Sequence, residues 1–551
     1  METYSQNSKN RVREEALKYA IRSLTRDRYS STIAPVTQIR NIVDSALFHY
    51  PEQSYLISQL NDEIIYTWEK FYKASIGSKK RYELKVAYLC GPEPENDLNI
   101  MIKEGVLPQN VWAFENDNAT FENAKHQILR SKYPYLKIVK RNIKDFFQST
   151  SITFDIIYLD FCSTLLDKAN IDVLTTLFYN HILSPLGIVI TNFSFSNYKD
   201  NKLTYKNILS FSSNYLYFKE SLETKFRENG DCSEGPTILS YSCPECENEC
   251  KSQMNSDDFD DFCNPFINAV KKRPEEYYGQ CITRFLFDLP SSIIPSQQLF
   301  ENSNQLSGII GNEIKLPNAL IYNLFSNDEN PETKTLHDVP NLLNFLVEES
   351  FDVNDWPAKS VYSLYKKTKF NNFLQKINIS NKKDQYIDLI KKLFFHELFV
   401  SENATQILDF EETSLGDFKN KWSDIIQSKN SFCDVFLFHQ LIEILLAQIA
   451  VPYFPNIEKT KRWTYKARQH RMFTDLIIFD QGRYLMDWIP TPEMLSELNF
   501  DIQTELSTRF ILDSFAKNNG YFLNNLFFGG NVVPIDEINF KTMRKRKHII
   551  K

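Results

Sequence analysis

The sequence predicts an α/β fold with a parallel sheet, a helical extension before it and a large, mainly helical region after it. First, five short apolar runs alternate with helix-like segments between residues 85 and 195. Strands that alternate with helices pair in parallel and carry helices on both faces of the sheet. Second, apolar residues recur at three and four positions on either side of this stretch, which is typical of amphipathic helices. Third, the low glycine content, 14 residues in all, fits a helix-rich protein with few tight hairpins.

Residues 1–80 are predicted to form the N-terminal helical extension. Apolar residues lie at helical spacing at Val12, Ala16 and Ala20, and again around Val43. Such a spacing gives each helix one apolar face. We expect these helices to pack against the sheet, with the alternative that the extension covers a ligand site or contacts a substrate.

Residues 81–300 are predicted to hold the sheet. Its apolar runs are short and are bounded by polar or turn-forming residues, as expected for strands. Ligands of such sheets bind beyond the carboxyl ends of the strands. The predicted strands are residues 85–90, 110–114, 136–140, 154–159 and 187–191.

Polar residues follow these strands where a ligand would bind. Gly91 opens the turn after the first strand, and the helix that follows offers a partly positive N-terminus to an anionic group. Glu115 closes the second strand, where a carboxylate can accept hydrogen bonds from both hydroxyls of a ribose. Asn142 follows the third strand and could read an adenine edge, and Asp160 ends the fourth and would face the reacting group. These positions imply an adenosine derivative as ligand.

This layout resembles the class I S-adenosylmethionine-dependent methyltransferases over about a fifth of the chain. The matching features are Tyr88-Leu-Cys-Gly91, the acidic Glu115, Asn142 with Asp145, and the strand 154–160. The resemblance implies a Rossmann-like methyltransferase core with a seven-stranded sheet that ends in a reversed hairpin. The candidates for the remaining strands are residues 237–241 and 282–287.

The resemblance also assigns ligand roles position by position. It places the methionine part of S-adenosylmethionine near Gly91, the ribose on Glu115, the adenine near Asn142 and Ile143, and the methyl acceptor beside Asp160. The first turn departs from the family, because it reads Cys-Gly-Pro-Glu-Pro-Glu where the family carries two or three glycines. The residues expected to bind the cofactor are Gly91, Pro92, Glu93, Asp97, Glu115, Asn116, Asn142, Ile143 and Asp160.

Asp160 and Cys162 are the candidate catalytic residues. Asp160-Phe-Cys-Ser163 is loosely similar to the Asp-x-Pro-Cys-Ser of RNA cytosine methyltransferases, in which a thiolate is the nucleophile, although it is one residue shorter and lacks the proline. The alternatives are that Cys162 is a small buried hydrophobic residue and that Asp160 caps the following turn. For Glu115 the alternative is an N-cap or a surface carboxylate.

A cysteine-rich insertion is expected at about residues 232–281. A Cys-x-x-Cys turn presents two thiolates in the geometry of a tetrahedral zinc site, and two further cysteines lie close in sequence. A structural zinc ion is one reading, and an acidic loop with free thiols is the other. The expected zinc ligands are Cys243, Cys246, Cys250 and Cys263.

Beyond a polar linker at residues 301–335, residues 336–551 are predicted to form a mainly helical domain with a basic segment and a basic tail. The basic segment, residues 459–471, mixes cations for phosphates with rings for base stacking. The alternative is a solvated helix face whose rings pack inward. The residues expected to contact nucleic acid are Lys461, Arg462, Trp463, Tyr465, Lys466, Arg468 and Arg471.

Composition limits the functional classes. The net charge of −7 argues against a surface that coats nucleic acid, although a local basic groove is compatible with it. The sequence contains no apolar segment typical of a signal peptide or a membrane span, and nine largely unclustered cysteines fit a reducing compartment. We therefore expect a cytoplasmic protein with no membrane association.

The sequence favours an S-adenosylmethionine-dependent methyltransferase acting on RNA or DNA. The alternatives are a catalytically degenerate methyltransferase-fold scaffold, or a nucleotide-sensing subunit, within a multi-protein bacterial assembly. The proline and glutamate residues of the first turn motivate these alternatives. Protein partners are expected under the second reading.

Overall fold

The computed structural model describes the following parts of the chain: residues 7–34, 36–49, 61–223, 270–295, 450–467, 470–486 and 544–549, and the single residues 51, 54, 58 and 298. The predicted linker, the predicted zinc ligands and most of the predicted helical domain lie outside them.

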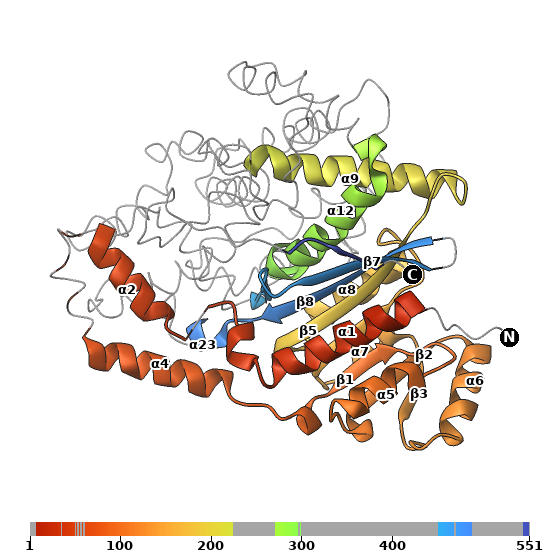
Figure 1. The fold of residues 1–551 in the computed structure, drawn as a ribbon, viewed down its shortest axis with the longest axis horizontal. Coiled ribbons are helices and arrows are strands. Elements are labelled where there is room, and N and C mark those ends of the chain that lie inside the picture. The colour runs from red at the N-terminus through yellow and green to blue at the C-terminus, as the bar shows by residue number, and fades with distance from the viewer. Residues whose placement is uncertain are drawn as a thin grey trace, which may run out of the picture.

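A mixed sheet of mostly parallel strands forms the centre of the described structure (Figure 1). The five strands predicted from the apolar runs are all present, and the fifth is longer than predicted because it begins at Leu183. The strands are β1 (Val86–Leu89), β2 (Val111–Glu115), β3 (Lys137–Lys140), β4 (Phe154–Asp160), β5 (Leu183–Phe195), β6 (Phe454–Pro455), β7 (Lys461–Ala467), β8 (His470–Asp480) and β9 (Lys547–Ile549).

The strand order is β3-β2-β1-β4-β5-β8-β7-β9, with β6 paired to β8. The first five strands of this order run parallel. β8 is antiparallel to β5 along the register from Leu186↔Asp480 to Phe195↔Arg471, and β7 is antiparallel to β8. A reversed strand therefore lies between β5 and β7, and β9 adds parallel to β7.

Helices flank this sheet, which gives a Rossmann-like α/β core. The α-helices are α1 (Asn7–Leu24), α2 (Gln38–His49), α4 (Asp62–Ile76), α5 (Glu95–Lys103), α6 (Asn118–Leu129), α7 (Ile143–Ser149), α8 (Lys168–Tyr179), α9 (Lys202–Glu223), α12 (Pro274–Asp288) and α23 (Arg483–Met486). Shorter helical turns are η1 (Arg28–Ser31), η3 (Arg81–Glu83), η4 (Pro108–Asn110) and η7 (Leu289–Ile293).

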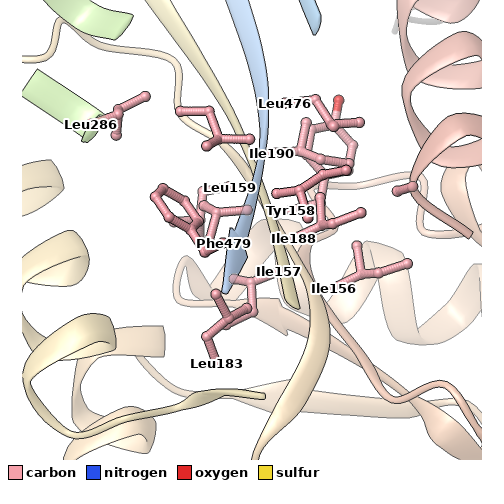
Figure 2. Packing of buried hydrophobic residues seen from close by; sticks show 14 of the residues in the cluster. Ile156, Ile157, Tyr158, Leu159, Leu183, Ile188, Ile190, Leu286, Leu476 and Phe479 are labelled. Atoms are coloured by element: carbon pink, nitrogen blue, oxygen red, sulfur yellow. The ribbon is translucent and has the colours of Figure 1, made fainter. Parts of the chain in front are cut away.

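The core lies on both faces of the sheet. All six residues from Phe154 to Leu159 of β4 are buried, as expected for a central strand covered on two sides. Figure 2 shows the alternation, with Ile156 and Tyr158 directed toward one side and Ile157 and Leu159 toward the other. Removing water from such side chains supplies roughly 1.5–3 kcal/mol for each one that is fully buried.

The N-terminal extension is helical, as predicted, and α1 packs directly on the sheet. Its apolar face contacts β4, β5, β7 and β8 as well as α5. The buried residues include Val12, Ala16, Leu17, Ala20, Ile21 and Leu24. The N-terminal turns of α1 also reach the edge of the sheet where the parallel strands end, because Lys9 and Arg13 pair there with Asp160 and Asp97. This position is compatible with the alternative that the extension covers a ligand site.

Two expectations about the later strands need correction. Residues 282–287 are not a strand, because they lie within α12, which is buried against β8 and α9. The alternative reading of the basic segment as a helix face is also wrong, because residues 461–467 and 470–480 form the antiparallel pair β7 and β8, although the rings do pack inward. A run of aromatic and β-branched residues favours a strand there, and pairing with β5 stabilises it. The sheet therefore draws strands from a region that was predicted to be mainly helical.

Candidate functional site

The candidate site lies at the carboxyl ends of the parallel strands. Parallel strands end at the same edge of a sheet, so the residues that close β1, β2, β4 and β5 gather there. Glu115 is the last residue of β2, and Asp160 at the end of β4 is in register with Asn192 of β5. Glu115 and Asp160 both lie close enough to Cys162 to influence its ionisation. The structure thus places Glu115, Asp160 and Cys162 at the same edge of the sheet.

Both oxygens of Asp160 are engaged. Its Oδ2 lies 2.8 Å from the Lys9 Nζ of α1. Its Oδ1 accepts a hydrogen bond of 2.7 Å from the Asn192 Nδ2. The Asp160 side chain is 13% exposed, so these partners hold it as a largely buried carboxylate with a fixed direction. This is a different environment from the turn cap that was the alternative reading.

Asn192 is a site residue that sequence reasoning missed. It is fully buried, and its Oδ1 accepts hydrogen bonds from Thr474 Oγ1 at 2.9 Å and from Tyr465 OH at 3.4 Å. The amide is therefore held at its oxygen by β8 and β7 while its nitrogen donates to Asp160. The available signal was a polar pair, Thr191-Asn192, inside an otherwise apolar strand.

A second ion pair joins α1 to the helix after β1. Arg13 Nε lies 2.7 Å from Asp97 Oδ1, and both side chains are buried. Burial raises the pKa of Asp97 to about 6, against the opposing effect of Arg13. Asp97 was expected to contact cofactor, but its nearest charged partner in the structure is Arg13. Sequence patterns give no signal for this pairing, because Arg13 lies in a separate helical extension.

The turn after β1 is compact and is held from within the protein. Gly91 has a φ of 59°, a left-handed conformation that favours glycine. Apart from its two chain neighbours, no atom of the described residues lies within 4 Å of the position of an added Cβ. Tyr88 OH donates a hydrogen bond of 2.8 Å to the Pro94 carbonyl, and α5 begins at the next residue. Pro92 and Glu93 are half-buried in this turn. The backbone at Gly91 is therefore open to close approach on the side where a Cβ would lie.

Glu115 is half-buried at the end of β2. Its Oε1 accepts a hydrogen bond of 2.8 Å from the Asp117 backbone N–H, and Asp117 rather than Glu115 is the N-cap of α6. Glu115 thus is not the helix cap of the alternative reading. Asn116, the next predicted ligand residue, is exposed.

Asn142 has a structural partner in the folded chain. It is the N-cap of α7, and its Oδ1 accepts a hydrogen bond of 2.9 Å from the Lys144 backbone N–H. Ile143 is buried at the first position of this helix. A cap of this kind contributes about 1 kcal/mol to stability, and that accounts for the residue without a ligand.

The two cysteines near the edge, Cys90 and Cys162, both have a thiol pKa that is raised by their surroundings. Cys162 is exposed, yet the surrounding protein atoms and the negative charge of Asp160 raise the pKa of its thiol. Cys90 is buried, and burial together with the charge of Glu115 raises its pKa as well. A nucleophilic cysteine requires the opposite shift, since the thiolate is the reactive form.

The predicted zinc ligands Cys243, Cys246, Cys250 and Cys263 lie outside the described residues. Within the described parts of the chain, no three His, Cys, Asp or Glu side chains are grouped as a metal site requires. None of the helices in those parts is long and apolar enough to cross a membrane.

The aromatic residues of the basic segment face the protein interior. Trp463 and Tyr465 are 4% and 1% exposed, so in this conformation neither ring is accessible for base stacking. Arg462 is also buried, and it donates to Gln280 Oε1 and to the Arg544 carbonyl. Lys466 is exposed at the end of β7.

The remaining cations of this segment lie near the surface. Arg471 is paired with Glu275 at 3.0 Å, and Lys461 lies over the ring of Tyr19. Arg468 lies outside the described residues.

No protein-family model matches this sequence, and no curated protein matches it.

Proposed function

We propose that this chain is a methyltransferase-fold protein that binds S-adenosylmethionine at the carboxyl ends of its parallel strands and transfers the methyl group to an acceptor beside Asp160. The observation that carries the proposal is the strand order, in which the reversed β8 lies between β5 and β7. A sheet of parallel strands that ends in such a reversed hairpin is the arrangement that the resemblance to class I methyltransferases implies.

The charges at the edge support a cationic ligand. Three carboxylates, Asp97, Glu115 and Asp160, stand with two cations, Lys9 and Arg13. The acidic groups outnumber the basic ones in this set, which favours a ligand that carries a positive sulfonium.

The chemistry proposed is a single displacement. S-adenosylmethionine, when bound, would supply a methyl group: the acceptor lone pair would form the new bond to carbon while the carbon–sulfur bond breaks, and the sulfur would keep that electron pair as a neutral thioether. Asp160 would orient the acceptor by accepting a hydrogen bond from it, and Asn192 would hold the Asp160 carboxylate in place. Glu115 would bind the ribose hydroxyls through its half-buried carboxylate.

Isothermal titration calorimetry with S-adenosylmethionine and with S-adenosylhomocysteine tests the proposal. We expect binding of both, and a loss of about 1–3 kcal/mol of binding free energy for Glu115→Ala, since charged hydrogen bonds to the ribose are lost. The matched control is Glu122→Ala, which removes an exposed carboxylate of α6. Equal affinity for the native chain and Glu115→Ala would contradict the role of Glu115.

The second candidate is a non-catalytic scaffold or nucleotide sensor. The observation that favours it is that Lys9 and Arg13 of α1 already neutralise Asp160 and Asp97. A sensor would bind the nucleotide and transfer no methyl group to any acceptor, whereas a scaffold would show no calorimetric signal with either compound.

A nucleic-acid acceptor remains part of the proposal, supported by cations that stay near the surface in β7 and at the end of the chain. We expect Lys461→Glu combined with Lys466→Glu to weaken binding to single-stranded RNA or DNA and to reduce its salt dependence, because each lost phosphate contact lowers counterion release. A gel-shift titration at two salt concentrations measures this. Lys168→Glu, at an exposed position in α8, is the control, and equal weakening by the control would remove the support.

A further inference from the structure

Residues 544–549, here called the C-terminal segment, add a strand to the edge of the sheet. β9 pairs in parallel with β7 through Trp463↔Lys547, Thr464↔His548 and Tyr465↔Ile549 (Figure 1). The side chain of Ile549 is buried. The segment is therefore held by backbone pairing and by one apolar anchor.

Arg546 is the polar anchor of this segment. Its Nη1 donates to Asp475 Oδ1 and, at 3.1 Å, to the Trp463 carbonyl. Its Nη2 donates to the Gly279 carbonyl at 2.9 Å and to Thr283 Oγ1 at 3.0 Å. The guanidinium carbon also lies 5.2 Å from the centre of the Phe473 ring, within cation–π range. The arginine socket, as we call this group, consists of Trp463, Phe473, Asp475, Gly279 and Thr283.

The arginine socket is shaped for a planar cation. Asp475 is fully buried in β8, and its other oxygen accepts from Thr283 Oγ1. A Cβ on Gly279 would approach the Phe473 ring to 2.8 Å and Arg546 Nε to 3.3 Å, so glycine allows the close packing of α12 on the strand and on the guanidinium. A buried carboxylate is costly without a charged partner, and a guanidinium donates to several acceptors at once.

The C-terminal segment also contacts the helix that reaches the candidate site. Lys547 Nζ lies 2.8 Å from Glu15 Oε2 of α1, and Trp463 Nε1 donates to the same oxygen at 3.0 Å. Lys9 and Arg13, on the same helix, pair with carboxylates at the strand-end edge. The segment thus joins the sheet edge to α1.

We propose that the edge of β7 opposite β8 and the arginine socket form a peptide-binding site, which the C-terminal segment of this chain occupies as an added strand. The ligand class is an extended peptide that carries an arginine and, three residues later, an apolar side chain. Backbone pairing supplies affinity in this mode of recognition, and the side-chain sites supply selectivity. The proposal goes beyond methyl transfer and stands on different residues.

The test uses the folded full chain with a protease site inserted after Lys541. After cleavage, we expect the released peptide to remain bound through gel filtration and to exchange slowly with a fluorescent peptide of residues 542–551. Release of the peptide as soon as the chain is cut would overturn the proposal. A stable dimer of the uncleaved chain, in which each copy places its C-terminal segment in the site of the other, would show that the site is not occupied by the chain's own segment.

Selectivity is tested on the peptide alone, so that folding of the protein is unaffected. Peptides with Arg546→Ala or Arg546→Lys should compete with the fluorescent peptide at least roughly tenfold less well than the native peptide does. The reason is that a hydrogen-bonded guanidinium is lost or is replaced by a point charge. His548→Ala is the matched control, since His548 is exposed, and it should compete as the native peptide does. Equal competition by all four peptides would show that no arginine socket operates.

Discussion

Single side chains at the strand-end edge combine predictable and unpredictable features. The places of Glu115 and Asp160 follow from sequence, because residues that close parallel strands share an edge. Lys9 and Asn192 could not be found in the same way. Asn192 is the polar exception in an apolar strand, and Lys9 reaches Asp160 from a helix distant in sequence. Contacts of this kind depend on the packed structure.

Asp97 gives a pH dependence at the residue scale. Burial raises its pKa to about 6 from the ordinary 3.8, so the folded state binds this proton more tightly than the unfolded chain. Its contribution to stability is present below about pH 4 and is lost as the pH rises through about 6. We expect the stability of the native chain relative to Asp97→Asn to fall by about 2–3 kcal/mol between pH 4 and pH 7.

Urea unfolding of both proteins at several pH values measures this difference. Asp117→Asn is a control of opposite sign, because hydrogen bonds from Thr120 lower the pKa of Asp117, and its contribution is lost as the pH falls. The free energy of unfolding of the native chain could instead differ from that of Asp97→Asn by the same amount at every pH. That result would show that the Asp97 carboxyl has the same pKa in the folded and the unfolded state.

Strands and helices were predicted with uneven success, and the difference has a physical reason. β1 to β5 form local apolar runs that end in turns, so the sequence around each strand was sufficient to predict it. β7 and β8 were misread because their basic residues suggested a solvated surface. The strands are fixed instead by pairing with β5, which lies far away in the chain. Residues 282–287 carry the same kind of apolar run as a strand but belong to a buried helix.

Gly279 supplies a test at the scale of one helix on one strand. Alanine is favoured over glycine by about 1 kcal/mol inside a helix. We nevertheless expect Gly279→Ala to destabilise the protein by about 1–3 kcal/mol, because the new methyl group would overlap the Phe473 ring. Thermal or urea unfolding measures the change. Glu276→Ala, at an exposed site of α12, should change stability by less than about 0.5 kcal/mol. A stabilised Gly279→Ala protein would show that α12 can move away from β8.

At the scale of the whole molecule, the two ends of the described structure meet. Glu15 of α1 accepts hydrogen bonds from Lys547 and from Trp463, so one carboxylate joins α1 to β9 and β7. The sequence marked the end of the chain only as a basic tail. Its docking could not be foreseen, since it depends on an acceptor group assembled from β7, β8 and α12.

A double-mutant cycle with Glu15→Gln and Lys547→Met measures this link. Both side chains are partly exposed, so we expect a coupling of about 0.2–1 kcal/mol that decreases as salt increases. The control is the same cycle with Glu14→Gln and Lys18→Met, because this exposed ion pair lies within α1 and connects α1 to no other element. No coupling between Glu15 and Lys547 at low salt would show that the ion pair does not tie the two elements together.

The pairing of β5 with β8 has a consequence for the synthesis of the chain. β5 is almost entirely buried in the folded protein, and the partner for one of its edges begins only at His470. At roughly 5–20 residues per second, a ribosome needs about fifteen seconds to a minute to make the intervening stretch of about 270 residues. During that interval an apolar strand edge has left the ribosome without its native neighbour, and such an edge is a target for chaperones and a site of aggregation.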